Sequence, residues 1–323
     1  MRASKNLVLA AVVLAVGLMP ASAAVTGHFE RTLKVNGPVD LNVVSGSGDI
    51  NVHTGSSDSV IVSAKIHASN SWLFGGSAED RIHQIEQNPP IEQQGNIIHI
   101  GRAQDRELFR NISIDYDVTV PAQTRLSSQT GSGDQTINGL QLPLTARTGS
   151  GNITVDGLGA DAHITSGSGD LKIGTVKGSL TATDGSGNIR AQSVAGEINA
   201  TTGSGDLEMH QVAPGNVRVG TGSGSIKLYG IKGGLRAQAG SGDILAEGQA
   251  TTDWQLGAGS GNITLKMPPQ ASFNIDARTS SGSLKVAPSV QGGTVSHNRV
   301  QGKVGNGGPL LDLHTGSGDI DVE

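Results

Sequence analysis

Apolar and polar residues alternate in short segments from residue 131 to the C-terminus. Within residues 167–184, Leu171 and Ile173 alternate with polar neighbours, and Leu180 and Ala182 do the same after a turn. Alternation over a few residues, bounded by glycine-containing turns, is typical of half-buried β-strands. We therefore expect two short strands in this segment, with the apolar side chains on one side.

The same pattern recurs at a nearly constant spacing. Each copy begins with Gly-Ser-Gly, followed by Asp, Asn or Ser and usually by Ile or Leu. The first glycines of eight consecutive copies follow one another at almost equal steps: Gly131, Gly149, Gly167, Gly185, Gly203, Gly222, Gly240 and Gly259. A fixed period of this kind indicates stacked repeats. The sequence therefore predicts an all-β fold, a parallel β-solenoid with about 18 residues per rung over residues 131–323.

Residues 24–130 lack the regular period and are expected to form a strand-rich N-terminal cap. The alternation predicts strands at 39–43, 60–66, 96–100 and 112–120. One helix is expected at 77–87, where Ser77 would cap its start and two prolines would end it. A single early copy of the repeat phrase at 46–50 suggests where the cap enters the solenoid.

The first 23 residues have the features of a secretory signal peptide. Arg2 and Lys5 precede an apolar run at 7–18, and small residues at 21–23 provide a cleavage site. The run is shorter than the roughly 20 residues of a membrane-spanning helix. We expect a cleaved signal, no transmembrane span in the mature protein, and a location in the periplasm, at the cell surface or outside the cell.

Composition adds three limits. There is no cysteine, so disulfides cannot stabilise the exported protein. Aromatic residues make up only 2% while glycines number 48, which favours a thin core over a globular one. Removal of the signal lowers the basic residues from 23 to 21 against 28 acids and takes the net charge from −5 to −7. Nucleic acid is therefore disfavoured as a partner.

The residue that follows each Gly-Ser-Gly raises the question of calcium. In the eight regular copies it reads Asp134, Asn152, Asp170, Asn188, Asp206, Ser225, Asp243 and Asn262, with no two aspartates adjacent. Calcium needs about six to eight converging oxygens, whereas stacked carboxylates ~5 Å apart repel by about 1 kcal/mol in water. All three residue types accept hydrogen bonds from backbone amides in turns. We expect a turn-capping role and no metal site.

No pattern predicts catalysis or a cofactor. The Gly-Ser-Gly copies lack the spacing of phosphate-binding loops and of a serine nucleophile elbow. Asp115 and Asp117 share one strand face, about 6.6 Å apart, which would suit an inverting glycosidase. The apolar stripe on the opposite face makes a solvated surface the simpler interpretation. The nine histidines show no zinc-binding spacing, and we expect no catalytic residue.

Three other features are candidates for contact with a partner. Trp72 and Phe74 either anchor an interface or, as we favour, plug the N-terminal end of the core. Extra residues near Pro214 and at three later places follow the first strand of their rungs, and insertions on one edge of a solenoid often form its binding surface: 248–253, 268–272 and 288–309. The alternating acids at 319–323 are expected to lie at the end of the rod, where they would discourage end-to-end stacking.

The chain resembles a bacterial family of exported β-strand repeat proteins that bear the provisional name of adhesins. The resemblance rests on residues 41–52, on the Tyr-Asp-Val-Thr-Val-Pro segment at 116–121, and on the repeats from Gly131 to Glu323. It implies a β-solenoid in the envelope or at the surface and carries over no catalytic residue. We expect a non-enzymatic adhesion or binding module that acts through one edge or its N-terminal cap and whose ligand is a surface, a glycan or a protein. The alternatives are a self-associating envelope scaffold and a carbohydrate-active β-helix enzyme.

Overall fold

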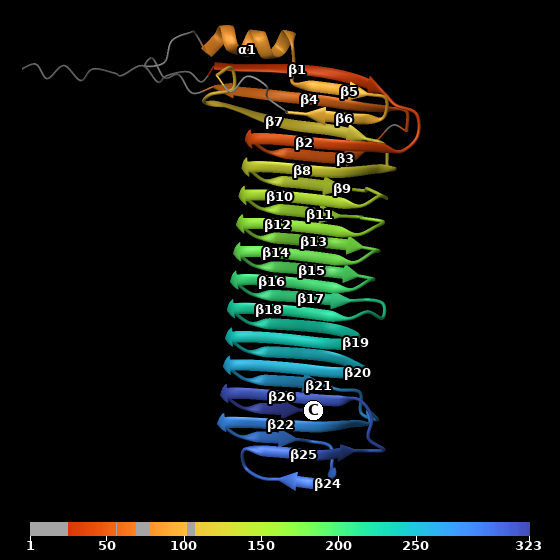
Figure 1. Ribbon diagram of the computed structural model, residues 1–323, viewed down its shortest axis with the longest axis vertical. Coiled ribbons are helices and arrows are strands. Elements are labelled where there is room, and N and C mark those ends of the chain that lie inside the picture. Colours follow the sequence, from red (N-terminus) through yellow and green to blue (C-terminus); the bar gives the residue numbers. More distant parts are fainter. Residues whose placement is uncertain (1–24, 56, 69–77, 102–106) are drawn as a thin grey trace, which may run out of the picture.

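The computed structural model describes residues 25–55, 57–68, 78–101 and 107–323. The described chain is almost entirely β and winds into a long, flat solenoid-like coil (Figure 1). This agrees with the all-β solenoid that the sequence predicts. The expected signal peptide at 1–23 and the pair Trp72 and Phe74 lie outside the described residues, so these expectations stay predictions.

The strand pairings form two long faces. Face A contains, from the N-terminal end of the coil, β1 (Val25–Lys34), β4 (Ser59–Ala68), β7 (Ile112–Val120), β3 (Ile50–Thr54), β9 (Gln135–Asn138), β11 (Ile153–Asp156), β13 (Leu171–Val176), β15 (Ile189–Val194), β17 (Leu207–Gln211), the first parts of β19 (Ile226–Ser241) and β20 (Ile244–Ser260), β21 (Ile263–Lys266), β27 (Ile320–Val322) and β23 (Leu284–Val286).

Face B contains, in the same direction, β5 (Ile91–Gln94), β6 (Ile97–Ile100), β2 (Val39–Ser47), β8 (Thr124–Ser132), β10 (Leu144–Ser150), β12 (Ala162–Ser168), β14 (Leu180–Ser186), β16 (Ile198–Ser204), β18 (Val217–Ser223), the second parts of β19 and β20, β26 (Leu310–Ser317), β22 (Phe273–Ser281), β25 (Arg299–Val304) and β24 (Val290–Val295). β19 and β20 bend around the corner and so belong to both faces.

Rungs stack in register because their inward side chains repeat. On face B, Leu144 pairs with Ala162, Ala162 with Leu180, and Leu180 with Ile198, all between parallel strands and each one repeat period apart. These side chains are buried, and with their counterparts on face A they form one continuous core along the coil. The outward side chains of the same strands are polar.

The recurrent glycines are required by contact between rungs as well as by turn geometry. Gly169 has a φ of 134°, in the region that favours glycine, and a Cβ there would collide with the carbonyl oxygen of Gly151 in the preceding rung. A Cβ on Gly167 would meet the carbonyl oxygen of Gly149 in the same way. The corner of each rung therefore stacks backbone directly on backbone.

The N-terminal end of the coil departs from chain order. The rung formed by β2 and β3 pairs in parallel with β8 and β9 on one side and with β6 and β7 on the other. Beyond β7, β4 and β1 continue face A in antiparallel fashion, and α1 (Ala78–Gln87) packs next to β1 at the end of the coil (Figure 1). The helix lies within the range expected from sequence, and buried Ile82 and Ile85 form its inner side.

The C-terminal end departs from chain order as well. β26 lies between β20 and β22, and β27 lies between β21 and β23, so the segment from Leu310 to the C-terminus fills a rung that the chain first skips. The expectation that the acids at 319–323 lie at the end of the rod is therefore wrong. The reason is that β22 and β23 form their rung one position further along, and β25 and β24 then extend face B antiparallel to β22.

The predicted insertions fall between the face A strand and the face B strand of their rungs. They follow β17, interrupt β20, and join β21 to β22, which places them at the corner opposite the Gly-Ser-Gly turns. The fourth segment, 288–309, is different because most of it forms the terminal strands β24 and β25.

Candidate functional site

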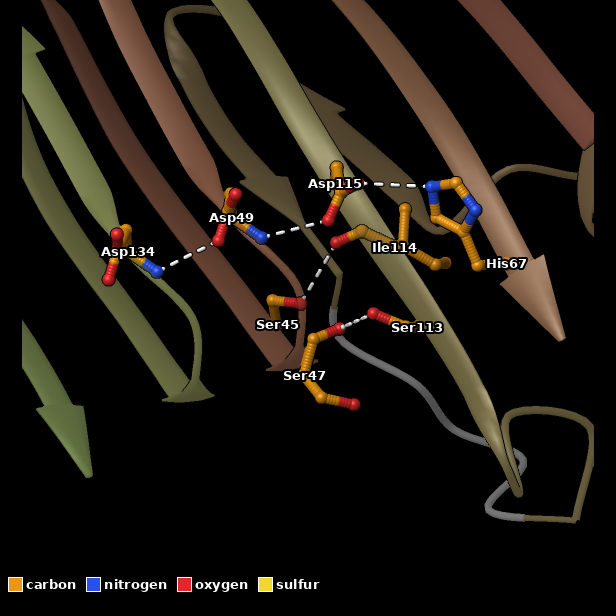
Figure 2. Close-up of polar contacts among 8 residues, drawn as sticks. All are labelled: Ser45, Ser47, Asp49, His67, Ser113, Ile114, Asp115 and Asp134. Carbon is orange, nitrogen blue, oxygen red and sulfur yellow. Dashed lines mark hydrogen bonds and ion pairs between the residues drawn. The ribbon is translucent and has the colours of Figure 1, made fainter. Parts of the chain in front are cut away.

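A ladder of side-chain hydrogen bonds follows the Gly-Ser-Gly corner. Oδ1 of Asp49 accepts the backbone N–H of Asp134 at 2.8 Å (Figure 2), and Oδ1 of Asp134 accepts that of Asn152 at 2.7 Å. The remaining bonds join Asn152 to Asp170, Asp170 to Asn188, Asn188 to Asp206, Asp206 to Ser225, Asp243 to Asn262, Asn262 to Asp319 and Asp319 to Ser283. These residues cap amides as expected from their types, but the amide belongs to the next rung and not to the same turn.

The first step of this ladder uses one acid of the Asp115 and Asp117 pair. Oδ1 of Asp115 accepts the N–H of Asp49 at 2.9 Å, and its Oδ2 lies 3.1 Å from Nε2 of His67 (Figure 2). Asp117 instead lies 3.5 Å from Nδ1 of His53. Each carboxylate thus has its own histidine partner, and Asp115 is also engaged in the backbone of the neighbouring rung. This arrangement supports a surface and structural role for the pair.

Asp184 is an exception in the row of small hydroxyl residues just inside the corner. Ser166 and Thr202, at the same position in the flanking rungs, each donate a hydroxyl to a glycine carbonyl oxygen. Oδ1 of Asp184 accepts the N–H of Ser186 at 2.7 Å, but its buried Oδ2 has no hydrogen-bond partner among the described residues. Burial raises the pKa of this carboxyl, against the opposing effect of the Ser186 bond, and the charge of Asp170 raises it further.

A polar groove of about 510 Å³ crosses the outward side of face B, over β14, β16, β18, β19 and β20. One row of outward positions forms its floor, because parallel register places Thr181 beside Asn199, then Arg218, Arg236 and Gln255. The residues just before these strands form its rim: Ser179, Glu197, Asn216, Gly234 and Asp253. Hydroxyl, amide, guanidinium and carboxylate groups therefore converge on one open surface.

The two arginines of the floor are the least compensated charges of the groove. Arg218 and Arg236 are direct partners on neighbouring parallel strands, where like charges destabilise each other. Neither side chain has an ion pair or hydrogen bond among the described residues. Elsewhere on face B, Arg125 pairs with Asp40 across neighbouring strands at 3.0 Å. The unpaired arginines therefore offer free N–H donors at the middle of the groove.

The two acids of the rim are held by other partners. Oε1 of Glu197 accepts a 3.4 Å hydrogen bond from the side-chain amide of Asn216, and Oδ1 of Asp253 accepts the backbone N–H of Leu310 at 2.8 Å. Under the groove, Trp254 is fully buried, and its Nε1 donates to the carbonyl oxygen of Gly233 at 2.7 Å. These hydrogen bonds hold the two rim acids, and the buried Trp254 anchors the strand beneath the floor.

A second hollow, of about 560 Å³, lies at the corner where the insertions occur. Lys232, Glu247, Gln249, Lys266 and Met267 contribute to its lining. Residues of two predicted insertions line it, Gly248, Gln249 and Pro268, and the expectation that this edge forms a binding surface stays a prediction. Its lining contains both basic and acidic side chains, and it lies at the corner between the two faces, whereas the arginine pair lies on face B.

The described residues contain neither a cluster of metal-binding side chains nor a helix that could cross a membrane. Among residues 25–55, 57–68, 78–101 and 107–323, no group of three or more His, Asp or Glu side chains is arranged to hold a metal ion. None of the helical segments in those same ranges has the length and apolarity that crossing a bilayer requires.

The sequence interpretation missed the groove, although a signal for it was present. Arg218 and Arg236 are one period of the repeat apart and occupy the same outward position of consecutive rungs. Attention to outward positions at one-period spacing would have placed them side by side. The rim acids and their partners have no comparable signal because their hydrogen bonds depend on the shape of the irregular corner.

Part of the chain is similar to a known protein family. The Toastrack DUF4097 family matches residues 191–323, a region that includes both groove arginines. A search of curated proteins found no match. Membership of the adhesin-named repeat family stays a prediction.

Three of the similar solved structures each match over 92% of this chain. One is provisionally described as a cell adhesion protein, from Clostridium sporogenes, with 12% identity, 98% of its chain covered and a TM-score of 0.23. Another is provisionally described as an adhesin, from Bacteroides fragilis, with 14% identity, 97% of its chain covered and a TM-score of 0.32. The third is provisionally described as a lipid-binding protein, from Parabacteroides distasonis, with 14% identity, 96% of its chain covered and a TM-score of 0.40. The part of the chain that matches the Toastrack family is the C-terminal part of the coil, residues 191–323.

Proposed function

We propose that the protein is an exported, non-enzymatic binding module that holds its ligand in the polar groove of face B. The observation that carries this proposal is the groove itself, which crosses five strands and contains two arginines without partners among the described residues. Binding groups that folding leaves unsatisfied, on a rigid repeat surface, favour a recognition role. Export is supported by the signal-like segment at 1–23.

The absence of an enzymatic role is part of the same proposal. Asp115 and Asp117 are the two acids whose spacing would suit a catalytic pair, and each contacts a histidine on a neighbouring strand. The rim acids Glu197 and Asp253 are likewise occupied by amide groups. These contacts favour structural roles for the four acids over the acid and base pair that glycoside hydrolysis requires.

The test is a binding screen of the mature chain, residues 24–323, on an array of bacterial envelope glycans. Asn199→Tyr places a ring in the floor of the groove, and Thr145→Tyr places the same ring in the same outward row but outside the groove. We expect Asn199→Tyr to weaken binding by at least roughly tenfold, about 1.4 kcal/mol, and Thr145→Tyr to leave it unchanged. Equal effects of both changes, or no binding by the wild-type chain, would contradict the proposal.

A further inference from the structure

The chemistry of the groove also indicates the class of ligand, provided that the groove is the binding surface proposed above. We infer that it binds an acidic polysaccharide, with the polymer chain running along the solenoid axis and its carboxylate or sulfate groups on Arg218 and Arg236. Three observations lead to this inference: the charge pattern of the floor, its lining, and its direction.

The charge pattern favours an anionic ligand. Two guanidinium groups on adjacent strands present planar sets of N–H donors, which match carboxylate and sulfate groups through paired hydrogen bonds. Their mutual repulsion is not relieved within the described part of the protein, although Arg125, Arg190 and Arg299 each have an acidic partner nearby. An incoming anion would provide the missing compensation for Arg218 and Arg236.

The lining favours a sugar polymer over other polyanions. Thr181, Asn199 and Gln255 provide the hydroxyl and amide groups that pair with sugar hydroxyls. Within the described chain, no aromatic side chain lines the groove to stack on nucleic acid bases.

The direction of the groove sets the orientation of the polymer. From Thr181 to Gln255 the floor crosses four strand steps, or roughly 19 Å at a strand spacing of about 4.8 Å. The two arginines lie in the middle of this row and the neutral residues on either side. An extended chain lying across the strands would therefore meet neutral groups, then two cations, then a neutral group again.

The experiment compares polygalacturonate with its fully methyl-esterified form, which keeps the sugar backbone and removes the charge. Dextran sulfate and dextran provide the same comparison for sulfate. Binding of the mature chain would be measured by biolayer interferometry at low and at physiological salt. The variants are Arg218→Gln with Arg236→Gln, and the control is Arg147→Gln, an exposed arginine of face B outside the groove.

We expect the wild-type chain to bind one or both anionic polymers in preference to their neutral forms. The double variant should lose roughly a hundredfold in affinity, and Arg147→Gln less than about twofold. The double variant should also melt at the same or a higher temperature than wild type, because a repulsive pair has been removed. That combination separates a ligand-binding role of the arginines from a structural one.

Several outcomes would overturn the inference, and they also separate it from the proposed function. Equal binding of neutral and acidic polymers, abolished by Asn199→Tyr, would reject the acidic ligand and retain the binding groove. An equal loss with Arg147→Gln would show non-specific charge attraction and reject the arginine pair. Stronger binding of duplex DNA through the same arginines would reject a polysaccharide. Failure to bind any of the polymers would reject the inference, whereas the array screen decides separately on the groove.

Discussion

The backbone N–H of Asp319 donates a 2.9 Å hydrogen bond to Oδ1 of Asn262, although 57 residues separate the two. In the regular part of the ladder, as between Asn152 and Asp134, the same bond joins residues 18 apart. Asp319 therefore takes the place that the next rung would occupy in a simple array. The ladder continues from Asp319 to Ser283, whose N–H and then hydroxyl hold the pKa of Asp319 below its ordinary value. The C-terminal rung is thus bonded to rungs on both sides.

Deleting residues 310–323 should therefore damage more than the last rung. The deletion removes β26 and β27 and leaves β20 and β21 separated from β22 and β23 by an empty position. We expect residues 263–304 to lose protection in hydrogen exchange followed by mass spectrometry, while the rungs at 131–223 keep it. The full mature chain is the control. Retained protection at 263–304 would show that β22 can move to pair directly with β20, and would contradict the expectation.

The alternation of charged and neutral residues in the ladder is a second feature that can be tested. Asn188 accepts the N–H of Asp206 through Oδ1 at 2.9 Å, and its Nδ2 donates to Oδ1 of Asp170 at 3.1 Å. Asn188→Asp keeps the acceptor but places three carboxylates on consecutive rungs. We expect a loss of about 1 kcal/mol in the free energy of unfolding at low salt, and less at high salt because the repulsion is screened.

The measurement for this change is urea unfolding at two ionic strengths. Asn188→Ser is the matched control because serine occupies the equivalent position at Ser225 without adding charge. It loses the bond to Asp170 and also the acceptor for the N–H of Asp206, since Ser225 accepts no such bond from Asp243 among the described residues, so it reports the cost of both bonds without added charge. A loss of stability that is the same for both variants and independent of salt would contradict the charge explanation.

Much of the regular array could be predicted because each rung carries the same local sequence pattern. Alternation at Leu171 and Ile173 and the spacing of the glycines were enough to indicate strands, corners and inward positions. The position of Asp319 could not be predicted in this way. Its rung has the same local pattern as any other, and only pairing between distant segments decides which neighbours it has. Local periodicity specifies the rung, whereas the order of rungs at the ends depends on long-range contacts.

The groove shows the same limit at the level of side chains. The outward positions of Arg218 and Arg236 follow from strand alternation, so their adjacency was within reach of the sequence. The hydrogen bond between Asp253 and Leu310 was not, because it joins an insertion in β20 to the displaced C-terminal rung. Irregular connections therefore determine the contacts of this rim acid, and those cannot be read from the repeat period.

Asp184 provides a prediction with a defined pH dependence. Asp184→Thr should restore the hydroxyl found at this position in the flanking rung, where Thr202 donates to the carbonyl oxygen of Gly187 at 3.0 Å. It also removes the buried Oδ2 that has no partner among the described residues. We expect the free energy of unfolding at neutral pH to rise by about 1 kcal/mol, because removing an unsatisfied buried polar group outweighs the loss of the hydrogen bond from the N–H of Ser186.

The sign of the pH effect follows from the raised pKa of Asp184 in the folded protein. Protonation of this carboxyl stabilises the wild-type protein. That stability is lost as the pH rises through the raised pKa of Asp184. The gap between Asp184→Thr and wild type should therefore be large at neutral pH and narrow below the ordinary aspartate pKa of about 3.9. Thermal unfolding at both pH values measures it, with Asp184→Asn as the uncharged control of similar shape. A gap that does not change with pH would show that the charge of Asp184 is not what destabilises this corner.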